Sequence, residues 1–454
     1  MKRREFLGQV AATASVPLGL GALIHVAAAP ESTRAPALVP ARAFALADGA
    51  RVNRWLAQFD RIGRTPGGIN RVAYSDADLA GRTFTLDLFR QAGLTPRIDA
   101  AGNIIGRVEG TDRALTPIVI GSHIDSVTDG GNFDGPLGSF GAIEVARTLR
   151  EQGTRLRHPL EVVVWSNEEG GVIGSKLAVG DFKSVDLDGV ARSGKTIREG
   201  IGLVGGNVAA LERDVRARGS AACYLELHIE QGGLLEQAGL LEQAGLLVGV
   251  VQGIVGLRFF EVTVEGVANH AGATPMDQRH DAVLAAARFT VAVNEAIRSE
   301  PGRQVATVGR VVPTPNTRNV IAGRVELTVD LRDLDVAKLD RFTERFKRLG
   351  GEIGAASGTT FSFREFTSSA PALADEAMMA AVESSAAQLG LSRQRMQSGA
   401  GHDAQEMSLI CPMGMIFVPS VGGVSHSPKE FTKAEDIVNG VNVLLNTVLR
   451  VDAR

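Results

Sequence analysis

The sequence of 454 residues is poor in cysteine, in aromatic residues and in net charge. Its two cysteines, Cys223 and Cys411, are too few for a disulfide framework, and both are expected to be buried, unreactive thiols. Aromatic residues make up 5% of the chain, which disfavours the stacking platforms that bind single-stranded nucleic acid. A formal net charge of −3 disfavours nucleic acid and anionic membranes as partners.

Long apolar stretches are also scarce, and the one near the N-terminus has the features of an export signal. Residues 2–7 (KRREFL) contain two adjacent arginines, residues 10–27 are largely apolar, and small residues suited to cleavage follow. We therefore expect residues 1–30 to be a twin-arginine signal for export to the periplasm or beyond. An uncleaved membrane anchor is the alternative, although the stretch is short for a span.

Alternating helical and strand patterns predict an α/β protein with an inserted second domain. Short apolar strands between helical stretches indicate a mainly parallel sheet. Residues 253–366 follow a β-α-β-β-α-β order, which indicates a small α+β domain of ferredoxin-like type. We therefore expect a larger domain over residues 41–252 and 367–454, interrupted by a smaller one over residues 253–366.

Several histidines and carboxylates follow predicted strands. A strand over residues 116–120 precedes His123, a strand over 160–165 precedes two glutamates, and a strand over 224–227 precedes His228. Open α/β sheets form their binding crevice at the carboxyl ends of the strands. We therefore expect these side chains to lie in one crevice.

Each motif has an ordinary alternative when it is taken alone. Asp125 is placed to accept the second imidazole N–H of His123, as metal-bound histidines require, but His-x-Asp is common by chance. Asp134 lies in a glycine-rich loop before a helix predicted over residues 140–152, where a helix cap is the simpler interpretation. Glu168 and Glu169 would be costly to bury unpaired, so a solvated loop competes with a division into one metal ligand and one base.

Five of the eight histidines lie in motifs rich in glycine or carboxylates, namely His123, His228, His270, His402 and His426. His25 falls in the predicted signal, and His158 and His280 lack such surroundings. We therefore expect metal binding or substrate contact at the five histidines in the motifs and not at the other three.

Together, the motifs resemble the metallopeptidase M20 clan, and within it the amidohydrolases of N-carbamoyl-L-amino acids, N-carbamoyl-β-alanine, allantoate and ureidoglycolate. The resemblance extends from about residue 50 to 450. It comprises, in order, GSHIDS at 121–126, DG at 134–135, NEEG at 167–170, ELHIEQG at 226–232, ANHAG at 268–272, NVI at 319–321, DLR at 330–332, GHDA at 401–404 and SHSP at 425–428.

The resemblance implies a catalytic domain with two divalent cations that share Asp134. The outer ligands would be His123 and His426 at one cation and Glu169 and His228 at the other, with this pairing left open. Zinc suits mixed histidine and carboxylate ligands, and manganese, cobalt or nickel would also fit.

The resemblance further implies hydrolysis of a ureido or amide C–N bond with Glu168 as the proton-transfer base. His270 would hold the developing oxyanion from the neighbouring subunit, which implies a homodimer formed through the inserted lid and dimerisation domain. The residues expected to contact the substrate are Gln231, Asn319, Arg332 and His402. For Arg332 the alternative is a surface ion pair with Asp330 or Asp333.

Two other functions stay open. One is an aminoacylase, dipeptidase or carboxypeptidase of the same clan, and the other is an exported binding protein without activity. Three departures leave the substrate undecided: the export signal, a tandem repeat (LLEQAG at 234–239 and again at 240–245), and the small residues Gly170 and Gly171, near which the family often carries a larger Arg-Phe pair.

Overall fold

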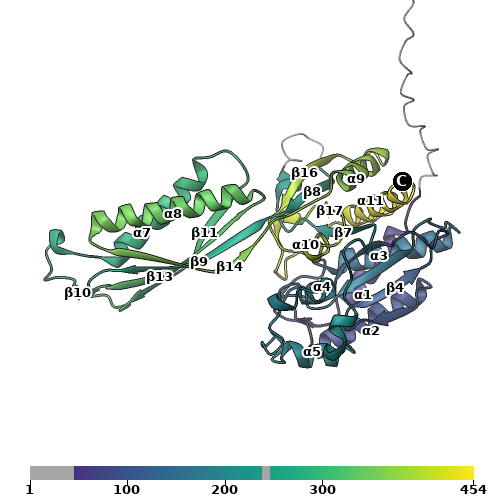
Figure 1. The fold of residues 1–454 in the computed structure, drawn as a ribbon, viewed down its shortest axis with the longest axis horizontal. Coiled ribbons are helices and arrows are strands. Elements are labelled where there is room, and N and C mark those ends of the chain that lie inside the picture. Colours follow the sequence, from purple (N-terminus) through teal and green to yellow (C-terminus); the bar gives the residue numbers. More distant parts are fainter. Residues whose placement is uncertain (1–44, 238–245) are drawn as a thin grey trace, which may run out of the picture. The chain divides into compact units, whose positions relative to one another are not determined.

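The computed structural model describes residues 45–237 and 246–454, which form a mixed α/β structure (Figure 1). The predicted α/β class is therefore confirmed at this level. The export signal predicted over residues 1–30 and the second copy of the repeat lie outside the described residues. Among the helices of the described ranges, none combines the length and the apolar character needed to span a bilayer.

A nine-stranded sheet forms the centre of the larger part of the chain. Its strand order is β15-β8-β17-β7-β5-β6-β4-β3, with β16 paired to β8. The strands are β3 (Pro96–Ile98), β4 (Ile104–Val108), β5 (Ile118–His123), β6 (Leu160–Trp165), β7 (Cys223–Ile229), β8 (Val248–Ile254), β15 (Ala372–Leu373), β16 (Arg393–Ser398) and β17 (Met413–Val418).

The expectation of a mainly parallel sheet is only partly correct, because the sheet is mixed. The central strands β6, β5, β7 and β17 are parallel to one another, and β16 is parallel to β8. The β3–β4, β4–β6, β8–β17 and β8–β15 pairs are antiparallel. A short connection between β3 and β4 forces that pair to be antiparallel, whereas parallel neighbours need long crossovers.

Helices cover this sheet and close its core. Strand β6 (LEVVVW) is buried along its whole length, as expected for a strand with both faces covered. Helix α3 packs on β5, β6 and β7, and α11 packs on β7 and β17. The helices of this part are α1 (Gly49–Phe59), α2 (Asp76–Gln91), α3 (Pro136–Glu151), α4 (Ile173–Val179), α5 (Ile197–Leu203), α9 (Glu376–Gln388), α10 (Asp403–Met407) and α11 (Ala434–Asp452).

Two glycines bring the start of α3 against the sheet. A Cβ at Gly138 would lie 2.0 Å from the carbonyl oxygen of Leu227, so only glycine permits this approach of α3 to β7. Gly135 has a φ of 82°, in the region that favours glycine, and reverses the chain before the helix. The loop carrying Asp134 therefore lies beside the ends of β5 and β7.

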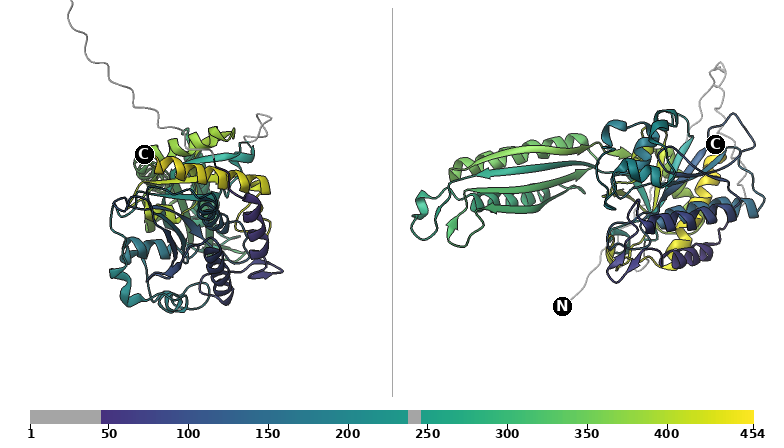
Figure 2. Two further views of the ribbon diagram at one scale, coloured as in Figure 1. Left: turned by 90° about the vertical axis from the view of Figure 1, so that its right-hand side faces the viewer. Right: turned by 90° about the horizontal axis from the view of Figure 1, so that it is seen from below.

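A separate four-stranded antiparallel sheet has the order β11-β13-β9-β14. Its strands are β9 (Gly256–Glu265), β11 (Val305–Thr314), β13 (Arg324–Asp333) and β14 (Thr360–Ser369). Helices α7 (Ala282–Arg298) and α8 (Val336–Ser357) lie side by side on one face (Figures 1 and 2) and share a core with it. Burial alternates along β13, as expected when one face is packed and the other is open.

Several elements are longer than the sequence pattern indicated. Helix α3 begins at Pro136 rather than at residue 140, because proline is well tolerated in the first turn of a helix. Strands β5 and β7 extend to include His123 and His228. Both histidines are therefore held by strand hydrogen bonds rather than by a loop.

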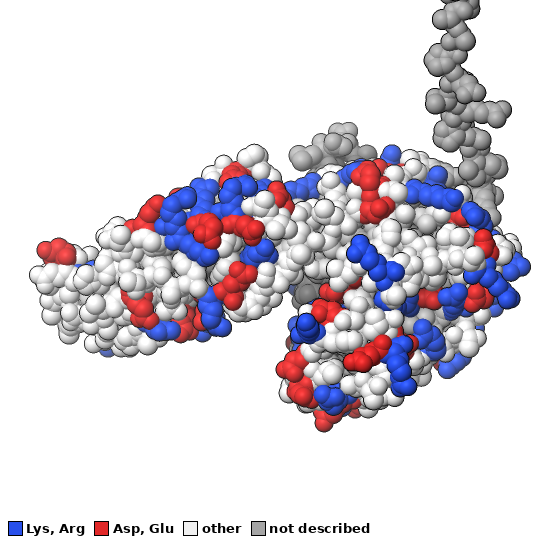
Figure 3. Space-filling model, viewed as in Figure 1, with Lys and Arg blue, Asp and Glu red and all other residues white. Residues whose placement is uncertain are grey.

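Charged side chains of both signs are interspersed over the face shown in Figure 3. Several form ion pairs, such as Arg341 with Glu300 at 2.9 Å and Lys347 with Glu344 at 2.8 Å. Exposed pairs of this kind each contribute at most about 1 kcal/mol to stability.

The contribution to stability of the core between the four-stranded sheet and helices α7 and α8 can be tested. Phe289 is fully buried between α7 and the small sheet, in contact with the rings of Phe361 and Phe363. Phe289→Ala is expected to lower the free energy of unfolding by about 3–5 kcal/mol. Guanidinium denaturation followed by circular dichroism measures it. Phe366→Ala, at a ring that is 48% exposed on the same sheet, should cost less than about 1 kcal/mol; equal losses would contradict the assignment of this core.

Candidate active site

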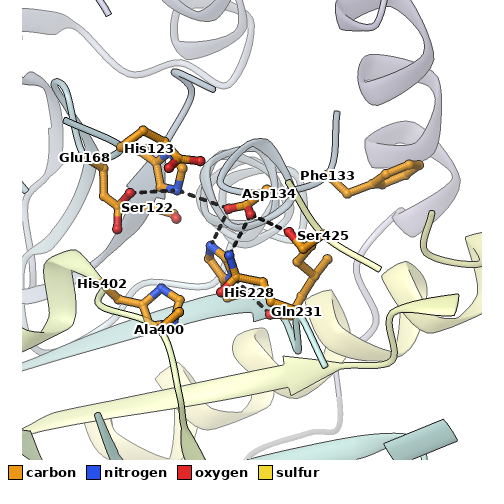
Figure 4. A network of polar contacts seen from close by, with 12 residues as sticks. Ser122, His123, Phe133, Asp134, Glu168, His228, Gln231, Ala400, His402 and Ser425 are labelled. Atoms are coloured by element: carbon orange, nitrogen blue, oxygen red, sulfur yellow. Dashed lines mark hydrogen bonds and ion pairs between the residues drawn. The ribbon is translucent and has the colours of Figure 1, made fainter. Parts of the chain in front are cut away.

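Three histidines lie close to the carboxylate of Asp134, and two of them, His123 and His228, are labelled in Figure 4. Its Oδ1 lies 3.6 Å from Nε2 of His123 and 3.3 Å from Nε2 of His228. Its Oδ2 lies 3.4 Å from Nε2 of His426. Helix α3 receives no hydrogen bond from a capping side chain, so the helix-cap interpretation of Asp134 is wrong.

The two adjacent glutamates lie on either side of this cluster. Oε2 of Glu168 is 3.7 Å from Nε2 of His123, and Oε1 of Glu169 is 3.4 Å from Nε2 of His426. The carboxylate of Glu168 is 9% exposed, so the solvated-loop interpretation does not hold for it. The pair is held at the end of β6, where the sequence placed it.

Three groups of the described side chains have the spacing of metal ligands, and two of them share Asp134; the third consists of Glu226, His228 and His402. Of the two that share Asp134, His123, Asp134 and His228 make one group, and Asp134, Glu169 and His426 make the other, with ligand atoms within 4.8 Å of one another in each. The candidate outer ligands are therefore grouped as His123 with His228 and Glu169 with His426, which differs from the pairing that the resemblance implied. The first pair follows from the strand order, because β5 and β7 are neighbours.

The donor atoms of the first group are prepared for a cation. Nδ1 of His123 lies 3.2 Å from the carbonyl oxygen of Asp125, and Nδ1 of His228 lies 2.9 Å from that of Ile229. Because a carbonyl only accepts, each Nδ1 carries the hydrogen and each Nε2 presents a lone pair in the neutral ring. Both Nε2 atoms are buried without a hydrogen-bond partner. Lone pairs that face a buried carboxylate fit a divalent cation between them.

Asp125 has a different contact from the one expected. Its backbone carbonyl, not its carboxylate, accepts from His123. The carboxylate accepts instead from the backbone N–H groups of Glu168 at 3.2 Å and Glu169 at 3.1 Å. The side chain of Asp125 therefore fixes the two-glutamate loop, while its main chain fixes the histidine.

The pKa values of Asp134, Glu168 and Glu169 are shifted in different directions. Burial alone would raise the pKa of Asp134, but its contacts with the histidines, when these rings also carry a hydrogen on Nε2, hold that pKa well below its usual range. Burial, reinforced by Asp403 and Glu169, raises the pKa of Glu168 well above its usual range. Burial and the charge of Asp134 raise the pKa of Glu169 to about 7. Acid groups buried this densely favour cation binding.

Backbone strain is concentrated around the cluster. Asn167, Gln231 and His426 have φ values of 56°, 59° and 53°, in the left-handed region that side chains other than glycine seldom adopt. Such strain persists only where surrounding contacts over-determine the conformation, as they often do at functional sites.

A cavity of about 880 Å³ opens onto the cluster. The expected site residues that line it are Asp134, Glu168, Glu169, Gln231, Arg332, His402 and His426. Small residues at 171, 369–372 and 400–401 line much of its remaining wall, so the cavity has room for a small organic acid beside the carboxylates.

Gln231 and His402 contact the cluster directly. Nε2 of Gln231 donates to Oδ2 of Asp134 at 2.6 Å, so this amide orients the carboxylate. The His402 ring packs edge-on against His228 at 4.5 Å and contacts the hydroxyl of Ser398 at 2.9 Å. Burial and the nearby charge of His228 lower the pKa of His402 well below its usual range, which keeps this ring neutral.

Arg332 forms the ion pair that the alternative interpretation anticipated, and it also lines the cavity. Its Nε and Nη2 donate to Asp330 at 2.9 and 2.8 Å, and Nη1 donates to the carbonyl of Gly399 at 2.7 Å. A guanidinium group has five N–H donors, so these three bonds leave two for a further acceptor. The hydrogen bond to Asp330 raises the pKa of Arg332, which stays a cation.

His270 and Asn319 are not brought into the cluster. Both are exposed and lie near the pair formed by β10 (Asn269–His270) and β12 (Val320–Ile321). Nδ1 of His270 accepts from the N–H groups of Gly272 and Ala273, each at 3.0 Å. The ring of His270 therefore presents Nε2–H as an outward donor.

Two residues near the cluster were not assigned a role from the sequence. The hydroxyl of Ser425 lies 2.8 Å from both Oδ2 of Asp134 and Oε2 of Glu430. Oε1 of Glu430 accepts from the backbone N–H groups of Phe133 and Asp134. The sequence could have indicated Glu430, because this carboxylate follows the candidate ligand His426 by four residues in the motif SHSPKE at 425–430.

Comparison with known proteins places this site in a family. Residues 119–450 match the family described as peptidase family M20/M25/M40. The chain is 38% identical over 406 residues to an N-carbamoyl-L-amino acid amidohydrolase of Geobacillus stearothermophilus, covering 88% of this chain and 98% of that protein. It is 35% identical over 396 residues to a ureidoglycolate hydrolase of Arabidopsis thaliana, covering 84% of this chain and 82% of that protein.

Solved structures agree with this result. The crystal structure of an amidase of the hydantoinase/carbamoylase family from Burkholderia multivorans superposes with a TM-score of 0.83 at 36% identity, covering 90% of this chain and 99% of that one. The resemblance drawn from the motifs is therefore confirmed. The chain belongs to the peptidase family M20/M25/M40.

Proposed function

We propose that this protein is a hydrolase of the ureido C–N bond in small N-carbamoyl or ureido acids. The substrates in question are of the N-carbamoyl-amino acid, allantoate or ureidoglycolate type, the kinds of compound for which its relatives are named. The observation that carries the proposal is Asp134, which two ligand groups share beside a glutamate, Glu168, that belongs to neither.

We assign the two ligand groups to two divalent cations. His123 and His228 would hold one, Glu169 and His426 the other, and Asp134 both. Zinc is the first candidate, and manganese, cobalt or nickel are alternatives for this donor set. Bound cations would supply Lewis acidity for the substrate carbonyl and for water.

The chain's own residues would divide the remaining work. Glu168 takes a proton from the attacking water and passes it to the departing nitrogen. Water adds to the ureido carbonyl and the C–N bond breaks, giving the amine and a carbamate that decomposes to carbon dioxide and ammonia. The low pKa of His402 suits a neutral ring beside the substrate, and the free N–H groups of Arg332 suit the substrate carboxylate.

Two further expectations belong to this proposal. Residues 253–366 would act as a lid and dimerisation domain inserted between residues 41–252 and 367–454. His270 and Asn319 would serve the site of a second copy in a homodimer, which fits the exposed Nε2–H of His270. Export through the twin-arginine signal would place the enzyme in the periplasm or outside the cell.

A substrate panel tests the activity. The metal-loaded protein is expected to release ammonia from allantoate, ureidoglycolate, N-carbamoyl-β-alanine or N-carbamoyl-α-amino acids. Turnover of dipeptides or N-acyl amino acids alone would indicate a peptidase or aminoacylase instead. Tight binding of ureido acids with no turnover under zinc or manganese would indicate a binding protein.

Glu168→Gln tests the assignment of the base. Because Glu168 lies outside both ligand groups, this variant should keep its metal content and lose about 10²–10⁴-fold in kcat. Glu169→Gln is the contrast, since Glu169 belongs to a ligand group and its loss should lower metal content. Metal analysis and steady-state kinetics of both variants measure the difference. Undiminished kcat in Glu168→Gln would refute the role.

Arg332→Ala tests recognition of the carboxylate. Loss of charge-assisted hydrogen bonds should raise KM by about 10- to 100-fold. Arg332→Lys should recover little of this, because a lysine lacks the planar fork. Arg324→Ala is the control, as Arg324 lies on the same strand and pairs with Glu265 and Glu326 at the surface. An unchanged KM in Arg332→Ala would leave the ion pair with Asp330 as the only role.

A further inference from the structure

Glu430 connects two parts of the candidate site that are far apart in the sequence. The residue follows the His426 motif, is 6% exposed, and reaches the loop before α3. Oε1 accepts from the N–H of Phe133 at 2.9 Å and from the N–H of Asp134 at 3.0 Å. A single carboxylate oxygen therefore fixes the backbone at the residue that both ligand groups share.

The other oxygen of Glu430 is directed to the loop that carries His426. Oε2 lies 2.8 Å from the hydroxyl of Ser425, and that hydroxyl lies 2.8 Å from Oδ2 of Asp134. The single hydrogen of this hydroxyl serves one carboxylate at a time, and both carboxylates lie against Ser425, the residue before His426. Since His426 has a strained backbone with a φ of 53°, its position depends on such contacts.

A glycine in the loop provides the space for this carboxylate. A Cβ at Gly131 would lie 2.3 Å from Oε1 and 2.4 Å from Cδ of Glu430. The φ of Gly131 is not in the left-handed region, so alanine there would meet the glutamate rather than strain the backbone. The site therefore contains both the carboxylate and the space for it.

We propose that Glu430 is a positioning residue that holds Asp134 and His426 in the geometry of a shared metal site. This inference depends on the proposed assignment of both residues as ligands. Glu430 acts on the backbone of one ligand and, through Ser425, on the loop of the other. The arrangement repeats that of Asp125, whose carboxylate accepts from the N–H groups of Glu168 and Glu169.

Zinc affinity of the full chain, measured by competition with a fluorescent chelator, tests the role. Glu430→Ala should weaken zinc binding by about 10- to 100-fold, as expected for a residue that orients ligands. Glu430→Gln should stay within about threefold of the wild type. Its amide oxygen still accepts the two N–H bonds, and its amide N–H can donate to the hydroxyl of Ser425.

Gly131→Ala provides a second route to the same effect, because it displaces Glu430 without removing a charge. It should weaken zinc binding in the same direction as Glu430→Ala. Gly202→Ala is the matched control, since a Cβ there meets nothing within 4 Å, and it should bind zinc like the wild type. If Glu430→Ala does not fold, Gly131→Ala still decides the question.

Wild-type zinc affinity in Glu430→Ala or in Gly131→Ala would overturn the inference. Equal losses in Glu430→Gln and Glu430→Ala would also overturn it, because they would trace the effect to charge rather than to the two backbone bonds. Zinc affinity is measured without substrate, so the result can be interpreted even if the protein does not hydrolyse ureido acids. A wild-type chain that bound none of zinc, manganese, cobalt and nickel would refute the proposed metal site and this inference with it.

Discussion

The carboxylate of Asp134, buried among three histidines, is the constraint on which the rest of the site depends. An ionised carboxylate is costly to bury unless it is paired. Here Gln231 and Ser425 donate to it, and Nε2 atoms of His123, His228 and His426 surround it. In the neutral rings of His123 and His228 two of those nitrogens present lone pairs, so the rings leave the carboxylate without a donor on that side. A divalent cation between them would supply the missing positive charge.

The fold brings the residues around Asp134 together at one edge of the large sheet. Parallel pairing of β5, β6 and β7 brings His123, the two-glutamate loop and His228 to the same edge. Gly138 lets α3 approach β7 closely, which carries the Asp134 loop to that edge. The buried carboxylates of Asp125 and Glu430 then fix the loops by accepting backbone N–H groups. Rigid strands hold two of the ligands, and hydrogen-bonded loops hold the others.

Much of this site could be predicted from the sequence, because its residues follow apolar, β-branched runs that have a recognisable period. The strand over residues 160–165 was predicted with the bounds that the structure shows. The mixed character of the sheet could not be predicted, since the direction in which β4 pairs with β6 and β8 pairs with β17 depends on strands far away in the sequence. Glu430 was missed because its partners lie 296 and 297 residues away. For Asp125, the sequence gives the spacing to His123 but not which of its oxygens faces the ring.

Metal binding and folding are coupled at such a site. The fold is destabilised without metal, because lone pairs on His123 and His228 face a carboxylate and Glu168 and Glu169 lie close by. A cation would remove this destabilisation, so its binding would also stabilise the fold. In the proposed metal site, the same coupling would give the carboxylates of Asp125 and Glu430 their importance, because they would hold the ligands in place before a cation binds. His270 contrasts with these ligands. Two backbone N–H groups donate to its Nδ1, so the hydrogen of the neutral ring is on Nε2 and points outward.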